Sequence, residues 1–264
     1  MSTEKHKIVS RTEWIEARKQ LLAREKQFTH ERDALSAARR DLPWVRVAER
    51  YEFERARGKA SLADLFDDKT QLVVYHFMFA PDWEAGCKSC SFWADNFHGI
   101  VEHLAHRDVR FVAISRAPLA KLAAYARRLG WQFEWVSSYG TAFNYDYGVS
   151  FTPEQLASGQ VPYNFGTWKA MGTELPGISV FTRQGNDVFH TYSCYARGLD
   201  MMNTAYHYLD LVPKGRDEEG LDFSMSWVRY HDQYGKNQFA DADKPYWPET
   251  EAASSTSCGC GSGE

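Results

Sequence analysis

The sequence predicts an α/β protein, with a central sheet covered by helices on its faces, and three observations carry this prediction. Runs rich in β-branched and aromatic residues alternate with amphipathic helical stripes between residues 71 and 136. The resulting order of strand, helix, strand, helix and strand implies right-handed crossovers between parallel strands. The chain has 264 residues, 44% hydrophobic and 25% charged, which is enough for one large core.

The first expected element is a long amphipathic helix, or a helix pair, over residues 11–40. Ser10 and Glu13 have capping-box spacing at its start, and Pro43 follows where a helix must stop. We expect this helical extension, residues 1–43, to pack on the main domain or on a second subunit, which leaves a homodimer open. Its apolar residues recur at approximately helical intervals at Trp14, Leu21, Leu22, Phe28 and Leu35.

The next segments predict a β-hairpin, a short helix and a buried strand. Apolar and charged residues alternate between 45 and 54, and a turn containing Gly58 follows. Ser61 has capping spacing before residues 62–66, which predicts a short helix. Residues 71–79 form a β-branched and aromatic run that suits a central strand.

Two more helices and two more strands complete the parallel part of the predicted sheet. Helical stripes cover residues 91–107 and the segment that begins at Pro118, and residues 109–115 and 131–136 have strand character. Residues 137–174 are rich in glycine and tyrosine, and we interpret them as an insertion.

The C-terminal part predicts a hairpin followed by a helix. Residues 178–182 and 187–192 are the two strands, and residues 199–211 form the closing helix. The main domain is therefore expected to span residues 44–240. The Ser- and Gly-rich residues 241–264 are expected to be a disordered tail.

Charge and hydropathy exclude two classes of partner. Lys and Arg number 31 against 35 Asp and Glu, and a net charge of −4 has the wrong sign for binding nucleic acid. The longest apolar stretch, residues 72–80, is far shorter than the roughly 20 residues of a membrane helix. The polar N-terminus shows no signal-peptide pattern, so we expect a cytoplasmic protein without membrane or nucleic-acid partners.

Cys87 and Cys90 form a C-x-x-C pair after a predicted buried strand and at the start of a predicted helix. The five cysteines are odd in number and unevenly spaced, which indicates chemistry rather than a disulfide scaffold. Free backbone N–H groups at a helix N-terminus stabilise a thiolate, so Cys87 is the expected attacking thiol. Cys90, one turn further in, would then resolve the mixed disulfide.

Other interpretations of the cysteines stay open. The pair could be inert, or it could be half of a zinc or copper(I) site in a non-enzymatic binding protein, with Cys258 and Cys260 as further ligands. Cys194 is expected to be a buried small hydrophobe. The redox interpretation calls for no cofactor and no metal ion, because two thiols suffice for exchange with a disulfide.

The residues around the pair resemble one family. The segments that carry the resemblance are 75–79 (YHFMF), 81–84 (PDWE) and 86–93 (GCKSCSFW). They resemble a bacterial thioredoxin-like family of uncharacterised function whose members are predicted dithiol-disulfide oxidoreductases, over most of the chain through Tyr234. The resemblance implies a thioredoxin-like three-layer fold with a central mixed sheet, an N-terminal helical extension and an insertion before the C-terminal hairpin. It also implies a reaction on a disulfide or other oxidised sulfur.

A thiol peroxidase is the alternative enzyme. Residues 58–66 (GKASLADLF) are similar to the opening of peroxiredoxin-type thioredoxin folds. In that alternative, Cys87 is oxidised to a sulfenic acid and Cys90 condenses with it. However, residues 81–87 lack the hydroxyl residue that the peroxiredoxin pattern places ahead of its cysteine.

Five further residues are candidates for binding or supporting a thiol or disulfide substrate, or a redox protein. Thioredoxin folds carry a proline, usually cis, before a strand that faces the dithiol, and Pro176 has that place, although a simple turn explains it equally well. Arg116 and Arg197 follow predicted strands and could hold an acidic thiol such as glutathione, although such arginines are commonly surface charges. Glu84 could relay protons, and Trp83 could wall a groove.

Overall fold

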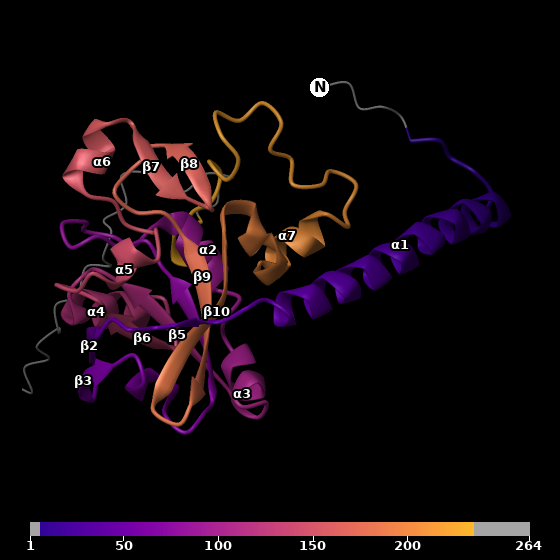
Figure 1. Cartoon of the computed structure of the whole chain (residues 1–264). Helices are drawn as coiled ribbons and strands as arrows, with labels where there is room; N and C mark the ends of the chain where they lie inside the picture. Colours follow the sequence, from indigo (N-terminus) through magenta and orange to yellow (C-terminus); the bar gives the residue numbers. More distant parts are fainter. Residues whose placement is uncertain (1–5, 235–264) are drawn as a thin grey trace, which may run out of the picture.

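One eight-stranded sheet carries the fold (Figure 1). The computed structural model describes residues 6–234. A separate two-stranded sheet, formed by β7 (Gln160–Tyr163) and β8 (Gly166–Lys169), belongs to the predicted insertion. In spatial order, the strands of the large sheet are β1 (Val45–Arg46), β10 (Asp187–Tyr195), β9 (Gly177–Gln184), β4 (Gln71–His76), β5 (Val109–Ser115), β6 (Glu134–Ser137), β2 (Glu52–Arg55) and β3 (Gly58–Ser61).

The centre of the large sheet is mixed, with parallel and antiparallel pairs. β4 runs parallel to β5 and β5 runs parallel to β6, whereas β9 is antiparallel to β4. Val74 of β4, for example, pairs with Val112 on one side and with Ser179 on the other. The predicted α/β fold class, with a central mixed sheet and helices on its faces, is confirmed.

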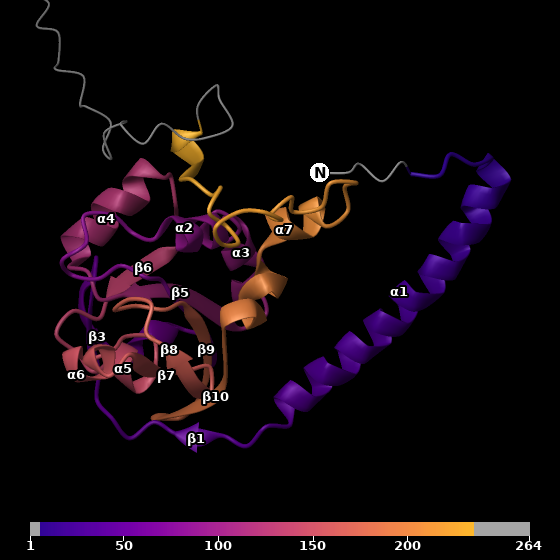
Figure 2. The ribbon, with the colours of Figure 1, turned by 90° about the horizontal axis from the view of Figure 1, so that it is seen from above.

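Helices and short 3-10 turns cover both faces of the sheet and extend from it (Figures 1 and 2). Those on the N-terminal side of β6 are α1 (Arg11–Arg40), η1 (Asp64–Phe66), α2 (Lys88–Ala94), α3 (Ile100–Ala105) and α4 (Leu119–Arg128). Those that follow β6 are α5 (Phe143–Asp146), α6 (Pro153–Ala157), η2 (Ala196–Met202), α7 (Thr204–Leu209) and η3 (His231–Gln233).

Alternation along β4 sends its side chains into two separate cores. Tyr75 packs in one cluster with Trp93 of α2 and Tyr125 of α4. Val74 packs on the opposite face in a cluster that includes Phe143 of α5 and residues of η1. Burying β4 on both faces explains why its sequence is almost continuously apolar. Consequently the loop that follows β4 starts from a strand that is packed on both faces.

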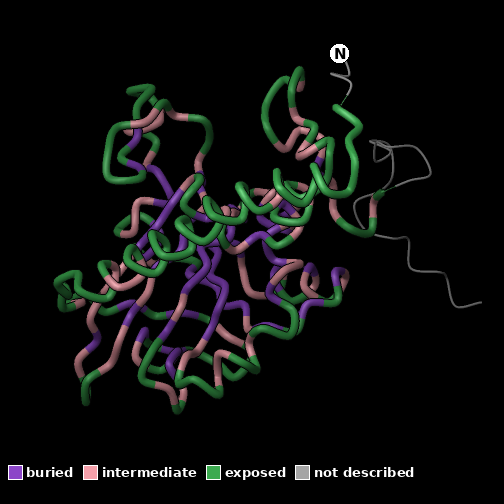
Figure 3. Tube along the Cα trace, turned by 90° about the vertical axis from the view of Figure 1, so that its right-hand side faces the viewer, coloured by how far each residue is buried: buried purple, intermediate pink, exposed green. Residues whose placement is uncertain are grey.

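Helix α1 agrees with the predicted bounds, and Ser10 and Glu13 form the predicted capping box. None of its residues is buried, and it extends away from the sheet (Figures 2 and 3). Only its last turn approaches the domain, where the Arg39 guanidinium lies 5.8 Å from the ring centre of Tyr192. No helix among residues 6–234 has the length and apolarity needed to span a membrane.

Two predicted helices are wrong in extent, because a polar side chain ends one early and another caps the start of the second late. The helix expected over 91–107 is divided into α2 and α3. The Asn96 side-chain amide donates to the carbonyls of Phe92 and Trp93 and so ends α2, and Gly99 precedes α3 with a φ of +82°. The helix expected over 199–211 begins only at Thr204, where the Asn203 side chain caps it.

The predicted hairpin with its turn at Gly58 is formed by β2 and β3. β1, for which no partner was predicted, pairs with β10. Two strands differ from the prediction in extent. β4 ends at His76, three residues before the predicted end, and β6 begins at Glu134 rather than at residue 131. Residues 77–80 leave the sheet toward the cysteine pair, which is why their apolar pattern continues beyond the strand.

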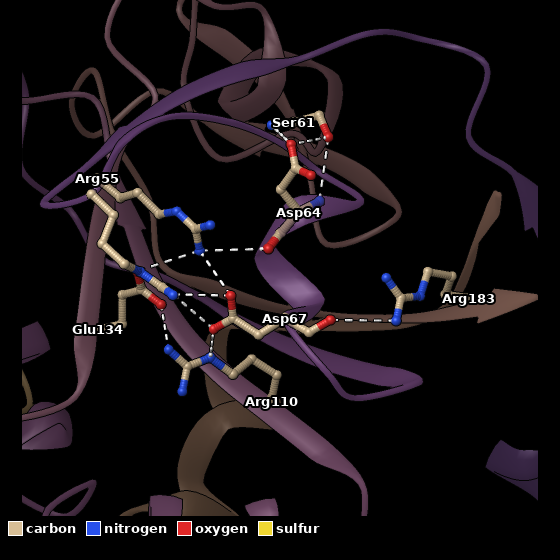
Figure 4. A network of polar contacts seen from close by, with 8 residues as sticks. Arg55, Ser61, Asp64, Asp67, Arg110, Glu134 and Arg183 are labelled. Carbon is tan, nitrogen blue, oxygen red and sulfur yellow. Dashed lines mark hydrogen bonds and ion pairs between the residues drawn. The ribbon is translucent and has the colours of Figure 1, made fainter. Parts of the chain in front are cut away.

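A network of charges closes the end of the sheet at which β5 and β6 begin (Figure 4). Asp67 forms ion pairs with Arg55, Arg57 and Arg110 at 3.1, 2.9 and 3.3 Å. Arg110 also pairs with Glu134. Because Cys87 follows the opposite end of β4, this network is remote from the cysteine pair and has a structural role.

Candidate active site

The cysteine pair lies at the start of α2, as predicted. Cys87 is the N-cap residue, its amide donates to the Met78 carbonyl at 3.0 Å, and its carbonyl accepts from the Ser91 amide at 2.9 Å. Cys87 is half-buried, and Cys90, one turn later, is only 2% exposed. Both thiols are free. The outer cysteine is therefore the one that a substrate can reach.

The two thiols have opposite electrostatic environments. The Cys90 thiol donates to Cys87, and this hydrogen bond lowers the pKa of Cys87 to about 7. Burial opposes the shift, and hydrogen bonds from Ser89 and the Cys90 backbone support it. Burial raises the pKa of Cys90, and its hydrogen bond to Cys87 raises it further. At neutral pH the arrangement favours a thiolate on Cys87 and a protonated thiol on Cys90.

Cys90 has two further polar contacts in the core. Its sulfur accepts a hydrogen bond from the Met78 amide at 3.4 Å. The buried hydroxyl of Tyr75 on β4 also reaches this sulfur, and that hydrogen bond lowers the pKa of Cys90 against the larger effect of burial. Both contacts would stabilise a Cys90 thiolate at the moment when it attacks Cys87.

Two tyrosines that are distant in the sequence contact the loop that precedes Cys87. Tyr230, from the C-terminal segment, donates to the Gly86 carbonyl at 2.8 Å, and Tyr125 of α4 does so at 3.4 Å. The Tyr125 hydroxyl also lies 2.9 Å from that of Ser91. The sequence places these residues up to 144 positions apart, so only the fold reveals the cluster.

The loop before Cys87 is held from two sides. Lys121 of α4 donates to the carbonyls of Pro81 and Trp83, each at 2.9 Å. Gly86 is buried, and a Cβ atom there would lie 2.8 Å from the Phe77 ring. A larger residue at 86 would therefore displace the loop that carries Cys87.

Pro176 lies at the same end of the sheet as the cysteine pair, because the adjacent Gly177 pairs with His76 at the end of β4. No described peptide bond is cis, so the bond before Pro176 is trans and not in the form usual for thioredoxin folds. The Pro176 carbonyl accepts from Tyr163 of the insertion at 2.7 Å, and Tyr163 accepts from the Ala196 amide at 2.9 Å. The insertion is thus anchored beside the site.

Arg116 is not a free cation. Its guanidinium pairs with the buried Glu174 at 3.0 Å and lies 4.7 Å from the ring centre of Tyr145. Burial raises the pKa of Glu174 to about 7, although the Ser150 hydroxyl and Arg116 oppose the rise. An anionic substrate at Arg116 would therefore compete with Glu174.

The remaining predicted site residues are less closely connected to the pair. Trp83 is half-buried against the core that contains Cys90, whereas Glu84 is exposed on the loop. The Arg197 side chain is 83% exposed and pairs with Asp200 at 2.6 Å. No described hydrogen bond or ion pair connects Arg197 or Glu84 to Cys87 or Cys90.

Metal binding by the chain receives no support from residues 6–234, where no group of three or more His, Cys, Asp or Glu side chains could hold an ion. Cys258 and Cys260, the proposed additional ligands, lie outside the described residues. Cys194 is buried, as predicted, and burial raises its pKa.

A family model described as "Bacterial protein of unknown function (DUF899)" matches residues 3–234. The chain belongs to this family. The match confirms the bacterial family of unknown function expected from the motif around Cys87, and DUF899 itself specifies no activity. No curated protein matches the chain.

Among solved structures, this DUF899 member is similar to the peroxidoxin BcpB of Mycobacterium tuberculosis, at 17% identity and a TM-score of 0.40, over 62% of this chain and 94% of that one. Peroxiredoxin Q of Xanthomonas campestris matches at 13% identity and 0.39, over 64% and 91%. A Bacteroides vulgatus protein described as a candidate thiol-disulfide oxidoreductase matches at 20% and 0.31, over 40% and 71%. These TM-scores lie below 0.5, so the likenesses carry no conclusion about reaction or substrate.

The lowered pKa of Cys87 predicts how its alkylation depends on pH. Iodoacetamide should modify Cys87 with a rate that rises through a midpoint near pH 7, against about 8.5 for a free cysteine. Cys90 should react only after Cys87 or on unfolding. Alkylation quenched at a series of times and followed by peptide mapping measures both rates. If the midpoint of the pH dependence for Cys87 lies at or above about pH 8.5, the ordinary value for a free cysteine, the assigned hydrogen bonding is contradicted.

Proposed function

We propose that this protein is a thiol-disulfide oxidoreductase in which Cys87 attacks and Cys90 resolves. One observation carries the proposal. The half-buried Cys87 thiol, with a lowered pKa, lies at the N-terminus of α2, and the buried Cys90 thiol, with a raised pKa, lies one turn later. That asymmetry is what exchange chemistry requires, because the first thiol must be an anion and the second must be retained until it is needed.

The reaction proceeds in two balanced steps. The Cys87 thiolate attacks a substrate disulfide, forming a Cys87 mixed disulfide and releasing one substrate thiolate, which takes up a proton. The Cys90 thiol then loses its proton, and its thiolate attacks the Cys87 sulfur and releases the second substrate thiol. Two electrons pass from the dithiol to the substrate. The reverse sequence, with a dithiol as reductant, regenerates the protein.

The substrate groove would lie between the loop that carries Trp83 and the residues around Pro176, which share one end of the sheet. The substrate class is a disulfide of a protein or of a small thiol such as glutathione. Arg116 would contribute to anion binding only if its pair with Glu174 opened, and Arg197 and Glu84 would act from the exposed rim. The substrate-binding roles of these five residues, Trp83, Glu84, Arg116, Pro176 and Arg197, are part of this proposal.

Equilibration of the full chain in graded glutathione redox buffers tests the proposed function. Free thiols are counted at each cysteine after acid quenching and alkylation. A C258S/C260S variant serves as a control, because it removes the thiols beyond the described residues. Cys87 and Cys90 should oxidise together as one reversible two-electron couple while Cys194 stays reduced. A Cys87 glutathione adduct that never proceeds to the Cys87–Cys90 disulfide would exclude the mechanism.

A further inference from the structure

Helix α1 carries an exposed apolar seam with a seven-residue repeat. Trp14, Leu21, Phe28 and Leu35 follow one another at intervals of seven, and their exposed fractions are 48%, 47%, 64% and 53%. A strict heptad spacing keeps one seam facing a partner only if the helix supercoils with another helix. A helix that packs on a globular domain needs a broader apolar face with a period of 3.6.

The described part of this chain does not cover the seam. The three apolar cores contain no residue of α1, and the helix stands away from the sheet over most of its length (Figures 1 and 2). A helix of 30 residues without tertiary contacts gains little stability from intrinsic propensity alone. We therefore expect a partner outside residues 6–234 to cover the apolar seam of α1.

The seam is complementary to itself when two copies run antiparallel. The second heptad row, three residues after the first, consists of Ala17, Arg24, Glu31 and Ala38. In an antiparallel pair the first row of one helix packs against the second row of the other. Full overlap then sets Trp14 opposite Ala38 of the second copy and Leu35 opposite its Ala17, so at both ends of the pair a large side chain meets a small one. The same register sets Leu21 opposite Glu31 and Phe28 opposite Arg24, where the methylene groups of the charged side chains cover the apolar ones.

The charges within the seam favour the same orientation. A parallel pair in register would set Arg24 against Arg24 and Glu31 against Glu31, and like charges within an interface are unfavourable. In the antiparallel pair, Arg24 of one copy lies about 4.5 Å along the axis from Glu31 of the other and about 6 Å from its Arg24, so the nearest charge within the seam has the opposite sign. At the flank, Arg18 is already neutralised by Glu25 of its own helix at 2.7 Å.

We propose that α1 forms an antiparallel two-stranded coiled coil with α1 of a second copy of this chain. Such a pair is isologous, because both copies contribute the same surface. It is about 45 Å long, from about 1.5 Å per residue, and it holds the two cysteine-bearing domains at its opposite ends. The inference does not depend on the proposed redox function.

Sedimentation of the full chain tests the pairing. We expect wild type to have twice the mass of one chain at micromolar concentration, and L21E/F28E to be monomeric. The matched control A23E/H30E adds the same two charges, also seven residues apart, to the outer face of α1, and it should stay dimeric. A monomeric wild type, or an L21E/F28E variant that stays dimeric, would overturn the proposal. An unchanged melting temperature of the main domain shows that these variants fold.

Charge reversal tests the orientation. R24E places a second acidic side chain near Glu31 of the other copy, so the dimer dissociation constant should rise roughly fivefold. The double variant R24E/E31R restores opposite charges and should return the constant to within about twofold of wild type. Equal constants for wild type and R24E would reject the antiparallel register.

Discussion

Cys87→Ser is expected to lower the single-turnover rate of disulfide reduction about a thousandfold or more, because a serine hydroxyl is not ionised at neutral pH. Glutathione disulfide is a suitable probe, with the reaction followed by mass spectrometry of the acid-quenched protein. Cys90→Ser should give a different result. Cys87 still attacks, but nothing resolves the adduct, so a mixed disulfide with one glutathione accumulates on Cys87.

Cys194→Ser is the matched control for these two variants, because Cys194 is also a buried free thiol but lies on β10. It should react at the wild-type rate. A Cys87→Ser protein that keeps its rate within tenfold of wild type would remove Cys87 from the mechanism. If reduced wild type instead reacts far faster with hydrogen peroxide than with glutathione disulfide, and a sulfenic acid forms on Cys87, the peroxidase alternative replaces the oxidoreductase proposal.

Asp67→Asn should lower the free energy of unfolding by about 2 kcal/mol, which for a chain of this size corresponds to a fall in melting temperature of roughly 5 °C. Asp67 faces three arginines and its side chain is 25% exposed, so removing its charge leaves Arg55 and Arg110 with less compensation. Asparagine keeps the shape and tolerates the positive φ of 49° at this position. Urea unfolding at pH 7 measures the loss.

Asp68→Asn is the control for this variant, since the Asp68 side chain is 78% exposed and pairs only with Lys69. Its effect should be within about 0.5 kcal/mol of zero. Burial raises the pKa of Asp67, but the hydrogen bonds from Arg57 and Arg55 and the charge of Arg110 outweigh it, so the pKa is lowered. The stabilisation is therefore present above about pH 4 and is lost as the pH falls through the lowered pKa. An undiminished difference at pH 2 would contradict this origin.

The sequence by itself determined the features whose signals are local. The capping box of Ser10 and Glu13 set the start of α1, and the apolar run through β4 identified the central strand. The position of Cys87 between that strand and a helix identified the candidate nucleophile, because strand periodicity and helix-start chemistry depend on neighbouring residues. The parallel order of β4, β5 and β6 followed from the same alternation.

Only the tertiary structure decided the features that depend on distant contacts. Asn96 ended α2 early because its amide found two backbone carbonyls there and its side-chain oxygen a partner at Thr204. Tyr75 reached Cys90, and Tyr230 reached Gly86 across 144 positions, through packing that no periodicity encodes. Arg116 was paired with a buried carboxylate from the insertion, which its place after a strand did not reveal. A single sequence specifies such contacts only through the whole fold, since each depends on surfaces that meet after the strands have assembled.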